Sequence, residues 1–113
     1  MDTVNLNFLI DKALNEIEHI VNTSKYYSIN KEPILSTIRV LNLLKDEIIA
    51  RPENINERIL RAMHDLGMSA YKEFENTALE SSLNNLTELL YKEIPKYKLL
   101  SPLREEFGKG NPI

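Results

Sequence analysis

Hydrophobic residues recur at intervals of three and four positions along the first part of the chain. The members of this set are Leu6, Leu9, Ile10, Ala13, Leu14, Ile17, Ile20 and Val21. This spacing places them on one stripe of a helix and leaves polar residues on the opposite side. We therefore expect an amphipathic helix here, followed by a loop over residues 23–28, where the period breaks.

A second helix is predicted over residues 30–50, because Asn30 can cap its N-terminus and Pro33 suits a first helical turn. Its apolar residues are Ile34, Leu35, Ile38, Val40, Leu41, Leu43, Leu44, Ile48 and Ile49. Val40 and Leu43 fall outside the main stripe, so the apolar surface is wider than one neighbouring helix covers. Either this helix contacts several others, or it presents an exposed face to a partner.

The second helix is expected to end at Arg51, because the residue before a proline, here Pro52, is pushed out of the helical region. A third helix should begin near Glu53, and Gly67 is its expected C-terminal stop. Its apolar positions are Ile55, Ile59, Met63 and Leu66. Residues 68–76 either extend this helix after a kink or form an ordered connector, and the pattern favours the helix.

A fourth helix should begin after Thr77, since Thr77 and Glu80 have the spacing of a capping box. Its apolar stripe consists of Leu79, Leu83, Leu86, Leu89, Leu90 and Ile94, and Pro95 stops it. Farther on, Ser101 before Pro102 is a second helix-start signal. This signal predicts a short terminal helix over residues 102–107 and a loose tail over residues 109–113.

Four long amphipathic helices with short connections predict an all-α protein, namely an antiparallel four-helix bundle with a short C-terminal helix and tail. A chain of 113 residues suits a single domain. We therefore expect one helical domain over residues 1–113, with a C-terminal appendage over residues 96–113.

Composition narrows the classes of function. The chain holds 17 acidic and 14 basic residues, a formal net charge of −3, so the charge gives no reason to expect nucleic acid as a partner. It has no cysteine, and no apolar run approaches the ~18 residues of a membrane span. We expect a cytoplasmic protein with at most peripheral membrane association.

Candidate catalytic and metal-binding residues are few. Glu16 and His19 form one Glu-x-x-His motif, whereas carboxylate-bridged di-iron bundles need it twice, and His19 should point to solvent. His64 precedes Asp65, but consecutive helix residues do not face each other, so a surface histidine is expected. The sequence therefore predicts no enzyme activity, no cofactor and no metal site.

The C-terminal segment is the best candidate for a protein-binding surface. It carries large apolar residues, some of which should fold back on the bundle: Tyr97, Leu99, Leu100, Leu103 and Phe107. Aromatic and arginine side chains inside a charged rim are typical of binding hot spots. The predicted partner-binding residues are Tyr97, Arg104, Glu105, Glu106, Phe107 and Lys109, with Tyr71 and Phe74 as outside candidates. Alternatively, the terminal helix only caps one end of the bundle.

Three stretches resemble the immunity proteins that protect producers of pediocin-like bacteriocins, particularly the enterocin A immunity type. Two of them are residues 85–89 (Asn-Leu-Thr-Glu-Leu) and residues 103–108 (Leu-Arg-Glu-Glu-Phe-Gly). In the third, within the third predicted helix, only the placement of Ile55, Arg58 and Ile59 is compatible with the family. Members of this family are cysteine-free antiparallel four-helix bundles of similar length with a C-terminal extension. They are often basic, whereas this chain is acidic, and its last five residues have no counterpart in the family.

The resemblance implies a cytosolic protein that recognises a bacteriocin-occupied sugar permease at the inner face of the membrane. By position, Arg104, Glu106 and Phe107 would carry this recognition. The sequence thus predicts a non-enzymatic immunity or antitoxin-like protein whose partner is a toxin, a bacteriocin or its membrane receptor. The alternative is a helical scaffold or regulatory protein that forms a homodimer through the second helix.

Overall fold

The computed structural model describes residues 1–97, 99 and 100. Within these residues there are five helices with defined bounds, residues 95–97, 99 and 100 are helical as well, and there is no strand, which confirms the predicted all-α class. The helices are α1 (Thr3–Thr23), α2 (Lys25–Ile29), α3 (Glu32–Ala50), α4 (Glu57–Glu73) and α5 (Ala78–Glu93). The predicted terminal helix over residues 102–107 and the tail lie outside the described residues.

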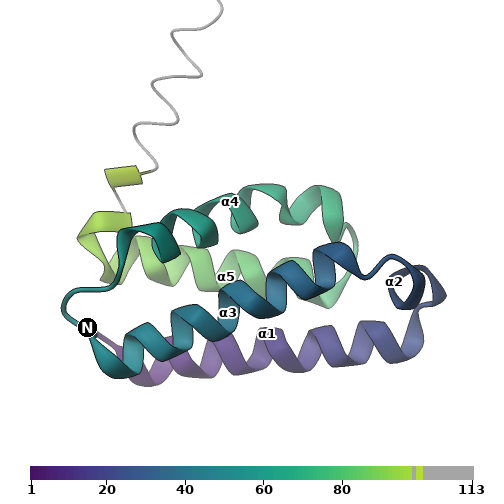
Figure 1. The fold of residues 1–113 in the computed structure, drawn as a ribbon, viewed down its shortest axis with the longest axis horizontal. Helices are drawn as coiled ribbons and strands as arrows, with labels where there is room; N and C mark the ends of the chain where they lie inside the picture. Colours follow the sequence, from purple (N-terminus) through teal and green to yellow (C-terminus); the bar gives the residue numbers. More distant parts are fainter. Residues whose placement is uncertain (98, 101–113) are drawn as a thin grey trace, which may run out of the picture.

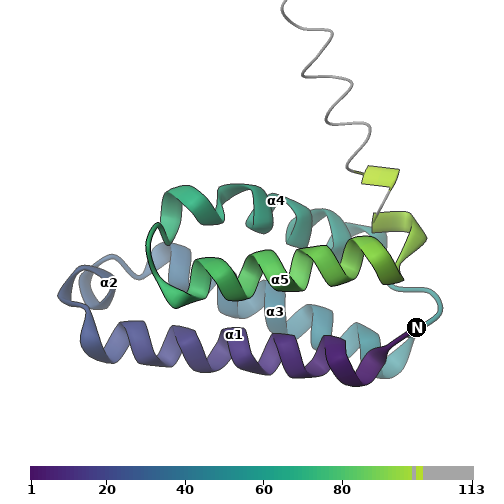
Figure 2. The ribbon, with the colours of Figure 1, turned by 180° about the vertical axis from the view of Figure 1, so that it is seen from behind.

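The four long helices pack lengthwise around a shared core (Figures 1 and 2). α1 contacts α3 and α5, and α4 contacts the same two helices. The buried residues of α1 are Leu6, Ile10, Ala13, Ile17 and Ile20, which all belong to the predicted stripe. Burying such a stripe is the main stabilising contribution to a helical domain of this size.

The short helix α2 lies at the end of the molecule away from the N-terminus (Figure 1), where a loop was predicted. That prediction is wrong because five residues are too few to show a hydrophobic period. Tyr27 anchors α2: its ring is buried beside Phe74, and its hydroxyl donates a hydrogen bond to the carbonyl of Glu73 at 2.8 Å. The capping position of α3 is consequently Lys31 rather than Asn30, while Pro33 does lie in the first turn as predicted.

The start of α4 also differs from the prediction. The helix begins at Glu57 rather than near Glu53, and the side chain of Asn56 caps it by accepting a hydrogen bond from the Arg58 N–H at 2.8 Å. The Asn56 N–H in turn donates to the carboxylate of Glu47 at 2.9 Å. Glu47 thus fixes the connection between α3 and α4.

Gly67 does not end α4, and the helix continues to Glu73 as the sequence pattern favoured. The glycine is explained by packing instead, because a Cβ atom at this position would lie 2.6 Å from Cγ2 of Thr87 on α5. Gly67 therefore allows the backbones of α4 and α5 to approach closely.

The predicted cap of α5 is confirmed in its forward half: Thr77 Oγ1 accepts a hydrogen bond from the Glu80 N–H at 3.3 Å. The returning bond differs, since Glu80 accepts from the N–H of Asn76 at 3.2 Å instead of from Thr77. Asn76 has a positive φ of 64°, a conformation that asparagine tolerates better than most residues. The helix ends at Glu93, two residues before Pro95.

Candidate partner-binding surfaces

The residues that follow α5 fold back onto the bundle. We call residues 94–97, 99 and 100 the closing segment. Ile94, Tyr97 and Leu100 are buried in the core, and Tyr97 is only 1% exposed. The Lys96 ammonium donates a hydrogen bond to the side-chain oxygen of Asn54 at 2.8 Å, so the segment is also held to the connection between α3 and α4.

Tyr97 packs between aromatic rings of two helices. Its ring centroid lies 5.6 Å from those of His64 on α4 and Tyr91 on α5. His64 is consequently buried, and the prediction of a surface histidine is wrong because Tyr97, from a distant part of the sequence, covers this position. Burial, together with the nearby Tyr91 and Asp65, raises the pKa of the Tyr97 phenol. The phenol therefore stays neutral at physiological pH.

The predicted partner-binding residues that the structure describes differ in their exposure to solvent. Tyr97 serves as the anchor of the closing segment, whereas its neighbour Leu99 is 71% exposed. The other predicted residues lie outside the described residues: Arg104, Glu105, Glu106, Phe107 and Lys109. Of the two outside candidates, Tyr71 is exposed, but Phe74 is 1% exposed and belongs to the core, so it is not accessible to a partner.

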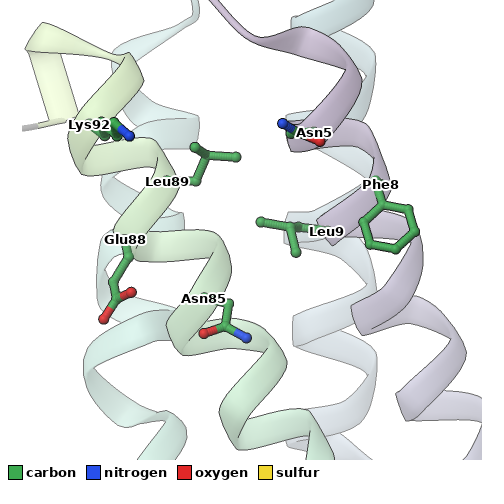
Figure 3. A pocket seen from close by; sticks show the side chains of 7 residues that line it. All are labelled: Asn5, Phe8, Leu9, Asn85, Glu88, Leu89 and Lys92. Carbon is green, nitrogen blue, oxygen red and sulfur yellow. The ribbon is translucent and has the colours of Figure 1, made fainter.

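A second surface feature is a groove of about 450 Å³ between α1 and α5. Figure 3 shows Leu9 of α1 and Leu89 of α5 pointing toward each other across it, with Phe8 on the outer side of α1. The remaining lining residues are Asn5, Asn85, Glu88 and Lys92. Phe8 is 63% exposed, which is unusual for a side chain of this size.

The groove was not predicted from the sequence. Phe8 lies off the hydrophobic stripe of α1, and an aromatic residue on the polar side of an amphipathic helix was a signal that could have revealed it. The position of α5 beside α1 is a tertiary feature, so the pairing of Leu9 with Leu89 could not be read from either helix alone.

The described residues offer no group of three or more His, Cys, Asp or Glu side chains that could hold a metal ion. His19 is exposed, as its place on the helix predicted. Within the same part of the chain, no helix is long and apolar enough to cross a membrane.

Comparisons of the chain with protein-family models, with curated proteins and with solved structures found no match. Any assignment of function therefore depends on the residues themselves and on the surfaces described above.

Proposed function

We propose that this protein is a non-enzymatic immunity or antitoxin-like protein, which protects a cell by binding a toxin or a toxin-occupied receptor in fixed stoichiometry. The observation that carries the proposal is the anchoring of the closing segment. Because Tyr97 and Leu100 are buried, the residue to which position 101 is joined is held against the bundle at a defined place, with the exposed Leu99 beside it. A recognition segment attached there would be presented from a rigid body.

The proposal includes the architecture expected for the resembled family, an antiparallel four-helix bundle. Two features support it. The long helices contact one another in the closed order α1, α3, α4, α5 and back to α1. Their connections are short, or in the case of α2 folded onto the bundle, and short connections favour antiparallel neighbours.

The composition of the chain after Leu100 supports a recognition role. Arg104, Glu106 and Phe107 combine a guanidinium, a carboxylate and an aromatic ring within four residues. Arginine and aromatic side chains contribute most of the binding energy in many protein interfaces. In the proposed function these three residues contact a bacteriocin-occupied sugar permease, or the toxin itself, at the cytoplasmic side of the membrane.

A truncated chain tests this function. The truncation point must lie after Tyr97, because this residue is buried in the core. Ending the chain after Pro95 would remove a core residue, whereas ending it after Leu100 keeps the whole closing segment. Bacteria sensitive to pediocin-like bacteriocins would express either the full chain or the chain ending at Leu100. We expect only the full chain to protect, while both forms have similar thermal stability.

Substitutions in the full chain refine the test. Phe107→Ala should remove most of the protection, and Leu99→Ala, which changes an exposed residue of the closing segment, serves as the matched control. Full protection by the chain ending at Leu100 would refute the location of the interface. If the full chain protects against no member of a broad bacteriocin panel, the immunity function itself is refuted.

The alternative proposal is a helical scaffold or regulatory protein that pairs with itself through α3. The exposed residues Leu35, Leu43 and Ile49 favour it. At 100° per residue they spread over about 120° of the helix surface, and Arg39 and Asp46 lie between them. A contact through α3 would therefore be interrupted by charges.

A substitution of Leu43 tests this alternative without disturbing the core. Val40 packs against the core, so a charge there would damage the fold, but Leu43 is on the surface. If α3 is the contact, Leu43→Glu should convert a dimer to a monomer in sedimentation experiments without loss of helicity.

A further inference from the structure

The groove between α1 and α5 has an apolar centre and polar edges. Leu9 and Leu89, both half-buried, point toward each other across it (Figure 3). Its volume is about 450 Å³, and Asn5, Asn85 and Lys92 lie along its edges. A hollow of this kind can receive one large apolar side chain. Covering the two leucines would remove apolar surface from water, which stabilises the occupant in the groove.

The closing segment brings the chain close to this groove. Tyr97 packs on His64 of α4 and Tyr91 of α5, so the segment lies on the side of α5 that faces α4. The groove lies on the side of α5 that faces α1, and its lining residues from α5 fall between positions 85 and 92. Because Tyr91 is within this range, the ring of Tyr97 and the groove lie at the same level along α5. The outer surface of one helix separates them.

Phe107 can reach the groove from the closing segment. Leu100 is buried in the bundle, and Phe107 comes seven positions later. Seven residues of extended chain span about 23 Å, whereas an α-helix with its side chains is about 10–12 Å across. This length is enough to cross the outer surface of α5. Leu103 is too close to Leu100 to do so, since three residues span only about 10 Å. Phe107 is also the only aromatic residue that follows Leu100.

We propose that Phe107 occupies the groove of its own chain when no partner is bound. The charges along this route are complementary. Arg104 comes three positions before Phe107, in the part of the chain that crosses α5. Figure 3 shows Glu88 on the side of α5 that faces away from α1, so the crossing chain brings Arg104 to Glu88. Glu106, next to Phe107, is brought to Lys92 at the edge of the groove.

This contact makes the recognition residues compete with themselves. Arg104, Glu106 and Phe107 are the residues that the proposed function assigns to the partner, and docking in the groove occupies all three. If about nine tenths of the molecules are docked, the apparent affinity for the partner falls about tenfold. This regulatory role rests on the proposed function, whereas the contact within the chain does not.

Tryptophan fluorescence of the full chain tests the contact without any partner, so its failure is distinguishable from failure of the proposed function. The chain has no tryptophan, and Phe107→Trp therefore introduces a single reporter. Acrylamide should quench this tryptophan about tenfold less efficiently than the reporter in Ile113→Trp, because the undocked state is the minor one. The difference should be the same at low and high protein concentration, since the contact lies within one chain.

A second substitution in the Phe107→Trp chain locates the docking site. Asn85→Arg places a bulky side chain in the groove and should raise the quenching close to that of the Ile113→Trp reporter. Asn42→Arg is the matched control, because it makes the same change at an exposed position of α3. It should leave the quenching unchanged.

Charge reversal tests the route over α5. Glu88→Arg should raise the quenching about twofold, and adding Arg104→Glu should reverse this increase, because the pair is re-formed with opposite signs. Quenching at position 107 as efficient as at position 113 overturns the inference. So does an equal effect of Asn42→Arg and Asn85→Arg, or quenching that falls as protein concentration rises, which would place another copy in the groove.

Discussion

The two ends of the molecule are each closed by a buried tyrosine, but the two tyrosines are held differently. Tyr27 belongs to α2, which is connected to α1 on one side and to α3 on the other. Its hydroxyl bonds the carbonyl of Glu73, and its ring lies 5.8 Å from that of Phe74. Tyr97 follows the last long helix and is held by ring contacts with His64 and Tyr91.

The two tyrosines therefore differ in how much of the structure would have to rearrange if each were released. Releasing Tyr27 would disturb the connection between two long helices, whereas releasing Tyr97 requires a rearrangement only after Glu93, where α5 ends. Local opening of this kind costs less free energy than global unfolding. We therefore expect the end that carries the closing segment to open at a lower free-energy cost than the α2 end.

The largest expected effect is at the α2 end. Phe74→Ala should lower the free energy of unfolding by about 4 kcal/mol, since it leaves a cavity beside Tyr27 that the backbone cannot easily close. Urea denaturation followed by circular dichroism measures this loss. Tyr71→Ala, a change at an exposed aromatic residue of α4 three positions before Phe74, should stay within about 0.5 kcal/mol of the wild type.

A smaller and more local effect is expected at the other end. Tyr97→Ala should lower the free energy of unfolding by about 3 kcal/mol at most, because undocking of the closing segment limits the loss. Hydrogen exchange should show lost amide protection in residues 94–100, with α1 and α3 unaffected. Loss of amide protection throughout α1 would show instead that releasing Tyr97 unfolds the whole bundle, so that opening at this end is not local.

The connection between α3 and α4, to which Lys96 of the closing segment is hydrogen-bonded, is held by the carboxylate of Glu47. The hydrogen bond from Arg51 at 2.6 Å, followed by the one from the Asn56 N–H, lowers the pKa of the Glu47 carboxyl. A carboxyl whose pKa is lower in the folded state adds stability above its unfolded pKa and loses it as the pH falls through the folded value.

Glu47→Gln should therefore be less stable than the wild type at neutral pH, and the difference should shrink as the pH falls below about 4. Thermal unfolding over a pH series measures this. Glu57→Gln is the control, because Glu57 and its partner Arg61 are 3.9 Å apart and both exposed. A Glu47→Gln difference that stays constant down to acidic pH would contradict the role given to this carboxylate.

The helical class and the core positions were predictable because burial follows local periodicity. The stripe of α1 identified its buried residues without any tertiary information. Gly67 was misassigned because glycine has two uses, ending a helix or allowing a close approach, and only the position of Thr87 distinguishes them.

The candidate sites depended more on contacts between distant segments. His64 looked like a surface residue on its own helix, and it is buried by Tyr97, more than thirty positions later. The hydrophobicity of Tyr97 and Leu100 was enough to predict that they fold back on the bundle. It was not enough to predict which residues they contact. The groove beside Phe8 required the pairing of the first and last long helices, which no local pattern encodes.

We propose that this protein acts by stoichiometric binding through the chain that follows its closing segment. The most direct measurement is the mass of the complex recovered when the tagged full chain and the chain ending at Leu100 are each purified from host membranes exposed to bacteriocin. We expect a bacteriocin or permease to be bound at a constant ratio to the full chain and to be absent from the shortened one. Equal recovery with both chains, or substoichiometric recovery with the full chain, would contradict it.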